Sequence, residues 1–133
     1  MQSKGKVFYT VGILAWILFL CLFIVDCSTF TRNTYGSIKT SAVMVDSAMK
    51  VCAELYAEGY ISDEELEDIK ALHRSYRSTY MIAVDSLAAY KQTGDKADRE
   101  MLDYAIVEMT VLGGEIAVLA DNHILKKSKK GGK

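Results

Sequence analysis

Apolar residues fall into four blocks along the chain, separated by short polar or glycine-containing segments. The first block runs from Val7 to Val25 without a charged residue, and the other three repeat at the three-to-four-residue spacing of an amphipathic helix. Proline, which interrupts helices, is absent. The pattern predicts an all-α chain, with one N-terminal transmembrane helix followed by a small antiparallel three-helix bundle or a helical hairpin.

The N-terminal run is long enough to cross a membrane. It has nineteen residues without a charge, preceded by Lys4 and Lys6 and followed by Asp26. A helix of that length spans about 28 Å, close to the ~30 Å hydrocarbon core of a bilayer. Residues 1–27 are therefore predicted to anchor the chain in the lipid bilayer. The predicted span is represented by Val7, Trp16, Phe19 and Val25.

Basic residues near the run predict its orientation. Lys4, Lys6 and the amino terminus precede it, which favours the N-terminus inside and the rest of the chain outside. In a bacterium the anchor would lie in the cytoplasmic (inner) membrane, and the helical domain would lie in the periplasm. An alternative is a lipoprotein anchored through Cys27, because Ile24-Val25-Asp26-Cys27 has the register of a lipid-modified cysteine. Asp26, however, is not the small residue that such a site normally requires.

The remainder is predicted to form one helical domain over residues 37–125. Residues 28–36 are rich in Ser, Thr and Asn, which prefer non-helical conformations, and are predicted to be a linker. The first helix is expected over 37–58, ending at Gly59. Its apolar positions are Ile38, Ala42, Val45, Met49, Cys52, Leu55 and Tyr56.

Two further helices are predicted over 63–92 and 96–125. Ser62 and Glu65 form a capping box before the first, and Asp95 can cap the second. The short connection at Gly94 predicts an antiparallel pair. Gly113-Gly114 predicts either a kink or the close approach of another helix. The predicted packing seam consists of Leu66, Ile69, His73, Tyr76, Tyr80 and Leu87 on one helix and Leu102, Met109, Leu112, Ile116 and Leu119 on the other.

Charge is divided unevenly along the chain. The formal net charge is −1, yet residues 28–125 hold sixteen acidic and nine basic residues, a balance of −7. The last eight residues hold five lysines. An acidic domain of this kind is not expected to bind nucleic acid. Residues 126–133 are predicted to be a disordered basic tail, and Lys126, Lys127, Lys129 and Lys130 are its candidates for contact with an anionic surface.

No residue pattern predicts a catalytic site, a metal site or a cofactor. His73 and His123 fall on apolar seams, where a histidine is usually structural, and counting back from Gly94 places His73 level with Glu115. The acidic residues after Ser62 suit a helix N-terminus, where the helix dipole is positive. None of the common nucleotide, zinc-protease or serine-hydrolase motifs occurs. The chain is therefore not expected to be an enzyme.

In layout, the chain resembles small inner-membrane proteins of bacteria and their phages, including the spanin class of phage lysis proteins. Spanins combine an N-terminal span with a helical periplasmic part that has a basic end, which implies an envelope tether or lysis factor. Spanins are typically long coiled coils, whereas this chain has turns at Gly59 and Gly94. The leading hypothesis is a non-enzymatic, single-pass membrane protein whose helical domain mediates assembly, with itself or with the helices of a membrane or envelope complex.

Overall fold

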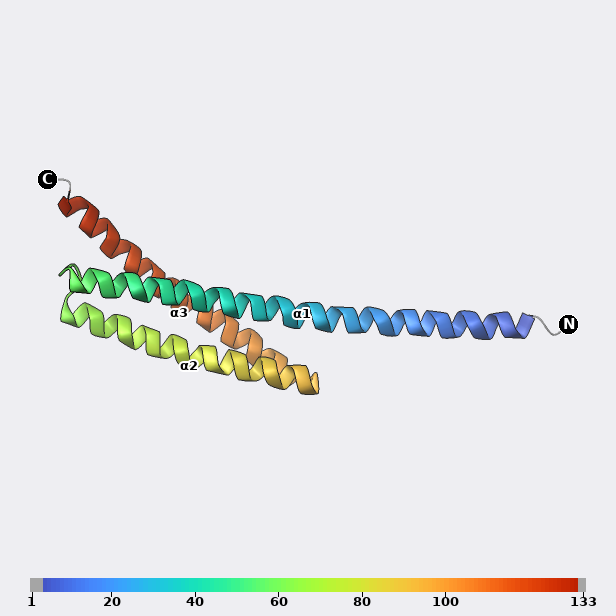
Figure 1. Ribbon diagram of the computed structural model, residues 1–133. Helices are drawn as coiled ribbons and strands as arrows, with labels where there is room; N and C mark the ends of the chain where they lie inside the picture. The colour runs from blue at the N-terminus through green and yellow to red at the C-terminus, as the bar shows by residue number, and fades with distance from the viewer. Residues whose placement is uncertain (1–3, 132–133) are drawn as a thin grey trace. The chain divides into compact units, whose positions relative to one another are not determined.

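The computed structural model describes the backbone of residues 4–131 and the side chains of residues 29–131. The described chain is all-α, as predicted, with α1 (Lys4–Ala57), α2 (Asp63–Thr93) and α3 (Lys96–Gly131). It divides into two compact units, Met1–Thr34 and Tyr35–Lys133. In the second unit the last part of α1 leads into α2, and α3 runs back along α2 (Figure 1).

The predicted membrane span precedes the residues whose side chains are described. Among those that are described, from residue 29 on, no helix is both long and apolar enough to cross a bilayer. The described side chains do not include those of Val7, Trp16, Phe19, Val25 and Cys27. The span and the alternative lipid anchor therefore stay predictions from the sequence.

The turn between α1 and α2 is built around Gly59. This residue has φ +76°, a left-handed conformation that glycine adopts without strain. The Gly59 amide donates to the Tyr56 carbonyl at 2.9 Å, and the Tyr60 amide donates to the Leu55 carbonyl at 2.9 Å. These two hydrogen bonds form a Schellman motif, which satisfies carbonyl groups at the end of α1. The motif reverses the chain so that α2 returns along α1.

The capping box predicted at the start of α2 is confirmed. The Glu65 amide donates to the Ser62 hydroxyl at 3.3 Å, and the Ser62 amide donates to the Glu65 carboxylate at 3.0 Å. Each residue thereby satisfies an amide that the helix itself leaves unpaired. The beginning of α2 is thus determined by local side-chain chemistry.

Replacing Ser62 with alanine is expected to lower the free energy of unfolding by about 1 kcal/mol, because the Glu65 amide loses its acceptor. Chemical denaturation followed by circular dichroism measures this cost. Ser78, which is exposed in the middle of α2, supplies the control. Its replacement by alanine should not lower stability, and an equal loss at both positions would contradict the capping account.

The connection between α2 and α3 is as short as predicted. Gly94 has φ +65°, and its amide donates to the Tyr90 carbonyl at 2.8 Å. The Asp95 carboxylate accepts from the Ala97 amide at 3.1 Å, which caps α3 as expected. Two residues therefore suffice to reverse the chain, and the helices on either side pack antiparallel.

The core of the second unit lies between the last part of α1, α2 and α3. One cluster within it joins all three helices near the Gly59 turn, and its buried members are Cys52, Leu55, Ile61, Ile69 and Ala120. Farther along, side chains of α1 and α2 lie close to the backbone of α3 at Gly113. A Cβ atom there would lie 3.2 Å from Val45 Cγ2 and 3.5 Å from Tyr76 Cε2. Of the two arrangements predicted at Gly113-Gly114, the structure has the close approach, and α3 continues through both glycines.

The structure differs from the sequence prediction at the two ends of the domain. Residues 28–36, expected to be a linker, are helical within α1. Helix propensity is a weak preference that neighbouring structure overrides, and hydroxyl side chains can bond to the preceding turn, as Thr40 does to the Gly36 carbonyl. Residues 126–131, expected to be a disordered tail, continue α3. Two of their lysines are held by ion pairs with the bundle.

Candidate functional site

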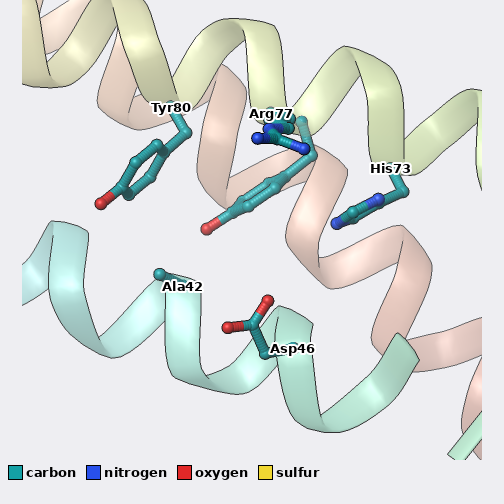
Figure 2. A pocket seen from close by; sticks show the side chains of 6 residues that line it. Ala42, Asp46, His73, Arg77 and Tyr80 are labelled. Carbon is teal, nitrogen blue, oxygen red and sulfur yellow. The ribbon is translucent and has the colours of Figure 1, made fainter. Parts of the chain in front are cut away.

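A hollow of about 250 Å³ lies between α1 and α2 in the second unit. Figure 2 shows Asp46 pointing from α1 toward α2, where His73, Arg77 and Tyr80 lie on successive turns. The spacing of four residues from His73 to Arg77 places both side chains on one side of α2. The hollow therefore holds one carboxylate, one guanidinium and one imidazole.

Tyr76 also lines this hollow. Its ring is buried, and its hydroxyl lies 3.0 Å from the Ser41 hydroxyl, either of which can donate. Burial raises the pKa of Tyr76, so the phenol stays neutral at ordinary pH. The rings of Tyr76 and Tyr80 have centroids 6.4 Å apart. These tyrosines mainly pack α1 against α2.

The hollow lacks the parts of a hydrolytic or transfer site. The Ser41 hydroxyl faces a phenol instead of a base, and no ion pair within 4 Å joins Asp46 to His73 or Arg77 among the described residues. Nor do three or more metal-ligating side chains gather anywhere in the described part of the chain. Its volume is also below the ~300 Å³ of typical small-molecule sites. A second hollow of about 240 Å³ beside it is lined largely by apolar side chains, including Ile38, Val84 and Leu87.

A charged cluster at the other end of the domain joins α2 to α3. Glu65 Oε1 lies 3.4 Å from Lys126 Nζ and 3.8 Å from His123 Nε2, while its other oxygen completes the capping box. The hydrogen bond from the Ser62 amide lowers the pKa of Glu65, and Lys126 lowers it further. His123 is buried, and its Nδ1 has no hydrogen-bond partner among the described residues. The cluster links the α2 cap to the C-terminal part of α3.

The lowered pKa of Glu65 makes stability depend on pH. A carboxyl group whose pKa falls on folding stabilises the protein above its unfolded pKa, and this contribution is lost as the pH falls through the folded value. The denaturant concentration at the midpoint of unfolding should therefore decrease as the pH is lowered from about 5 toward 3. In Glu65→Gln, which keeps the capping acceptor, the drop should be smaller. Glu64→Gln is the matched control and should behave as the wild type does; identical pH profiles for all three proteins would contradict the assignment.

The predicted packing seam is divided between buried and half-buried positions. Its buried members are Ile69, Tyr76, Leu87, Leu102, Met109 and Ile116. Its half-buried members are Leu66, His73, Tyr80, Leu112 and Leu119. On α3 the small residues Gly113 and Ala120 are buried beside these leucines. His73 does not pair with Glu115, which is exposed.

The feature of α3 that the sequence analysis did not predict is a second apolar stripe, here called the outer stripe. The buried face of α3 consists of Leu102, Ala105, Met109, Gly113, Ile116, Ala120 and His123. The outer stripe consists of Tyr104, Val107, Val111, Val118 and Leu125, all exposed. Each of its members follows a buried residue by two positions. Two positions correspond to about 200° around an α-helix, so the outer stripe lies opposite the buried face.

Exposure of this kind is concentrated on α3. Tyr104 is 66% exposed, Val107 64% and Val118 58%. Half of the large hydrophobic side chains that are exposed in the described part of the chain belong to this one helix. The five members of the outer stripe extend over twenty-two residues, or about 32 Å of helix. Extended exposed apolar surfaces on a small domain are typical of interaction sites.

The four lysines of the predicted basic tail are not equivalent. Lys126 pairs with Glu65, and Lys127 pairs with Glu58 and lies 5.7 Å from the centre of the Tyr60 ring. The pair with Glu58 raises the pKa of Lys127. Lys129 and Lys130 are exposed at the end of α3. The first two lysines therefore attach α3 to the bundle, and contact of Lys129 and Lys130 with an anionic surface stays a prediction.

Comparison with known proteins gives no relative for this arrangement. No protein-family model, no curated protein and no solved structure matches the chain.

Proposed function

We propose that the protein is a non-enzymatic, membrane-anchored assembly module whose helical domain binds another helix through the outer stripe of α3. The N-terminal run supports the anchor, since nineteen uncharged residues match the thickness of a bilayer core. The observation that carries the proposed assembly role is the outer stripe itself. Its members lie three, four, seven and seven residues apart, which keeps them on one side of the helix, and this side faces away from the core that holds the domain together.

The proposal separates two sets of side chains on one helix. Residues of the buried face are needed for folding, whereas Val111 and Val118 are needed for assembly. The test is the mass of the complex that contains the full chain after extraction in mild detergent. It is measured by light scattering with the detergent contribution subtracted. The wild type should have a mass above that of one chain. A chain carrying both Val111→Asp and Val118→Asp should have a lower mass and an unchanged denaturation midpoint.

A matched control comes from α2. Met81 and Ile82 are also exposed, but they do not belong to the outer stripe. Replacing both with aspartate adds the same charge and should leave the mass of the complex unchanged. A monomeric wild type, or an equal loss of mass in both double variants, would overturn the assembly role of the outer stripe.

The proposed localisation is the cytoplasmic membrane of a bacterium, with the N-terminus inside and the helical domain in the periplasm. The excess of basic groups before the apolar run supports this orientation. Single cysteines at Ser3 and Ser128 test it in intact cells with a membrane-impermeant maleimide. Labelling at Ser128 alone is expected. Labelling at Ser3 alone would reverse the orientation, and labelling at neither would remove the periplasmic location.

A further inference from the structure

The acidic surroundings of the outer stripe restrict what it can bind. Glu108 and Glu115 follow Tyr104 and Val111 by four residues, one helical turn, so they border the stripe. Asp121, three residues after Val118, borders the stripe on its other side. All three carboxylates are exposed and take part in no ion pair among the described residues.

No lysine or arginine lies in the part of α3 that carries these carboxylates. From Glu100 to Leu125 the sequence contains five acidic residues and neither lysine nor arginine. Lys96 and Arg99 precede this segment at the start of α3, and Lys96 pairs with Glu100. The other lysines of α3 follow the segment, and the first two of these pair with Glu65 and Glu58 on the side of the bundle. The outer stripe is therefore an apolar surface with a negative border.

A second copy of the same stripe is a poor occupant for this surface. Parallel pairing would bring each acidic residue beside its own counterpart. Antiparallel pairing would still place Glu108 and Glu115 of one copy near the acidic border of the other, because the central turns contain no basic residue. Like charges facing each other across a helix pair disfavour association. An anionic membrane surface would be repelled in the same way.

We infer that the outer stripe of α3 binds a cationic amphipathic helix of a partner protein, whose apolar residues cover the stripe and whose lysines or arginines face Glu108, Glu115 and Asp121. The inference rests on the proposed assembly function and identifies the partner's chemistry. Apolar contact along the stripe supplies affinity, and the acidic border selects the sign of the partner's charge.

Two designed peptides test this partner class on the full chain. Both are about four heptads long with valine and leucine at the a and d positions; one has lysine at e and g and the other has glutamate. The chain is held in nanodiscs of phosphatidylcholine, which has no net charge, and empty nanodiscs give the background. Calorimetry should show the lysine peptide binding at least about tenfold more tightly than the glutamate peptide.

Two sets of variants separate apolar contact from charge. Val111→Asp with Val118→Asp should lower the affinity for the lysine peptide by about 100-fold, because the apolar surface is interrupted by charge. Glu108→Lys with Glu115→Lys should reverse the preference in favour of the glutamate peptide. Met81→Asp with Ile82→Asp, the α2 control, should leave both affinities unchanged.

Each remaining outcome overturns the inference in a recognisable way. Equal affinity for the two peptides, or a preference for the lysine peptide that survives the charge reversal, would mean that the acidic border does not contribute to recognition. A complex of the wild-type chain alone that loses mass through Val111→Asp and Val118→Asp, and that the lysine peptide does not dissociate, would make a second copy the occupant. In that case the assembly function would stand while the partner class would fail.

Discussion

Replacing Ile116 with alanine is expected to lower the free energy of unfolding by about 2–5 kcal/mol. Ile116 is 0% exposed on the buried face of α3, so shortening its side chain leaves a cavity in the core. A domain of about one hundred residues has a total stability of only about 5–15 kcal/mol. The substitution therefore removes a large part of that stability, and the measurement is the midpoint of chemical denaturation.

Val118 provides the matched control for this prediction. It lies two residues after Ile116 on the same helix and is 58% exposed. Replacing it with alanine should change stability by no more than about 0.5 kcal/mol, because its side chain contributes little to the core. Equal costs at Ile116 and Val118 would contradict the assignment of the two faces of α3.

The second large effect is expected at Gly113. A Cβ atom at this position would already lie 3.2 Å from Val45 Cγ2, and leucine adds three further carbons. Gly113→Leu should therefore destabilise the domain by about 1–3 kcal/mol through overpacking, even though leucine favours the helical conformation. Gly114 is the neighbouring control, since nothing lies within 4 Å of a Cβ atom there. Gly114→Ala should stabilise the domain by about 0.5–1 kcal/mol.

A double substitution shows whether Val45 causes the cost at Gly113. If the contact between α1 and α3 is the reason, Gly113→Leu should cost less in a Val45→Ala background, and the coupling energy should be about 0.5–3 kcal/mol. The same cost in both backgrounds would mean that Val45 does not limit the space at this position.

The helix ends near the two turns were predictable because their causes are local. Ser62 and Glu65 act over three residues, Asp95 acts over two, and Gly59 and Gly94 adopt a backbone conformation that few other residues tolerate. None of these signals depends on which helix packs against which. The boundaries they set can therefore be inferred without a fold.

The side of α3 that faces the core was less predictable, because two apolar stripes run along this helix. The sequence predicts a single packing seam on this helix, which includes the large side chains Leu112 and Leu119. In the structure these leucines are half-buried, while Gly113 and Ala120 are buried, because small residues let the helices approach closely. The outer stripe follows from the same spacing shifted by two residues, and only the structure shows which stripe faces the core.

The ends of the domain were mispredicted for a different reason. Residues 28–36 and 126–131 have compositions that are unfavourable or neutral for helices when taken alone. Both segments continue helices that neighbouring residues have already begun, so the cost of starting a helix does not arise. Ion pairs of Lys126 and Lys127 with Glu65 and Glu58 hold the second segment against the bundle.

The antiparallel register of α2 and α3 could be counted from the sequence, but side-chain direction could not. Counting from the Gly94 turn places His73 level with Glu115, and the same count places Glu65 level with His123. The structure forms the second pairing, since His123 lies on the buried face beside Glu65. Glu115 is exposed, bordering the outer stripe, and does not pair with His73.

The most direct test of the assembly role is the accessibility of the outer stripe in the native membrane. Val118→Cys is placed in a chain whose Cys21 and Cys27 are serine; Cys52 remains, because it is buried and burial raises the pKa of its thiol. Ser78→Cys on α2 is the exposed control. Maleimide labelling at Val118→Cys should be slow in membranes and fast in the purified single chain, while Ser78→Cys should be fast in both. Equally fast labelling at Val118→Cys in membranes and in the single chain would mean that nothing covers the outer stripe.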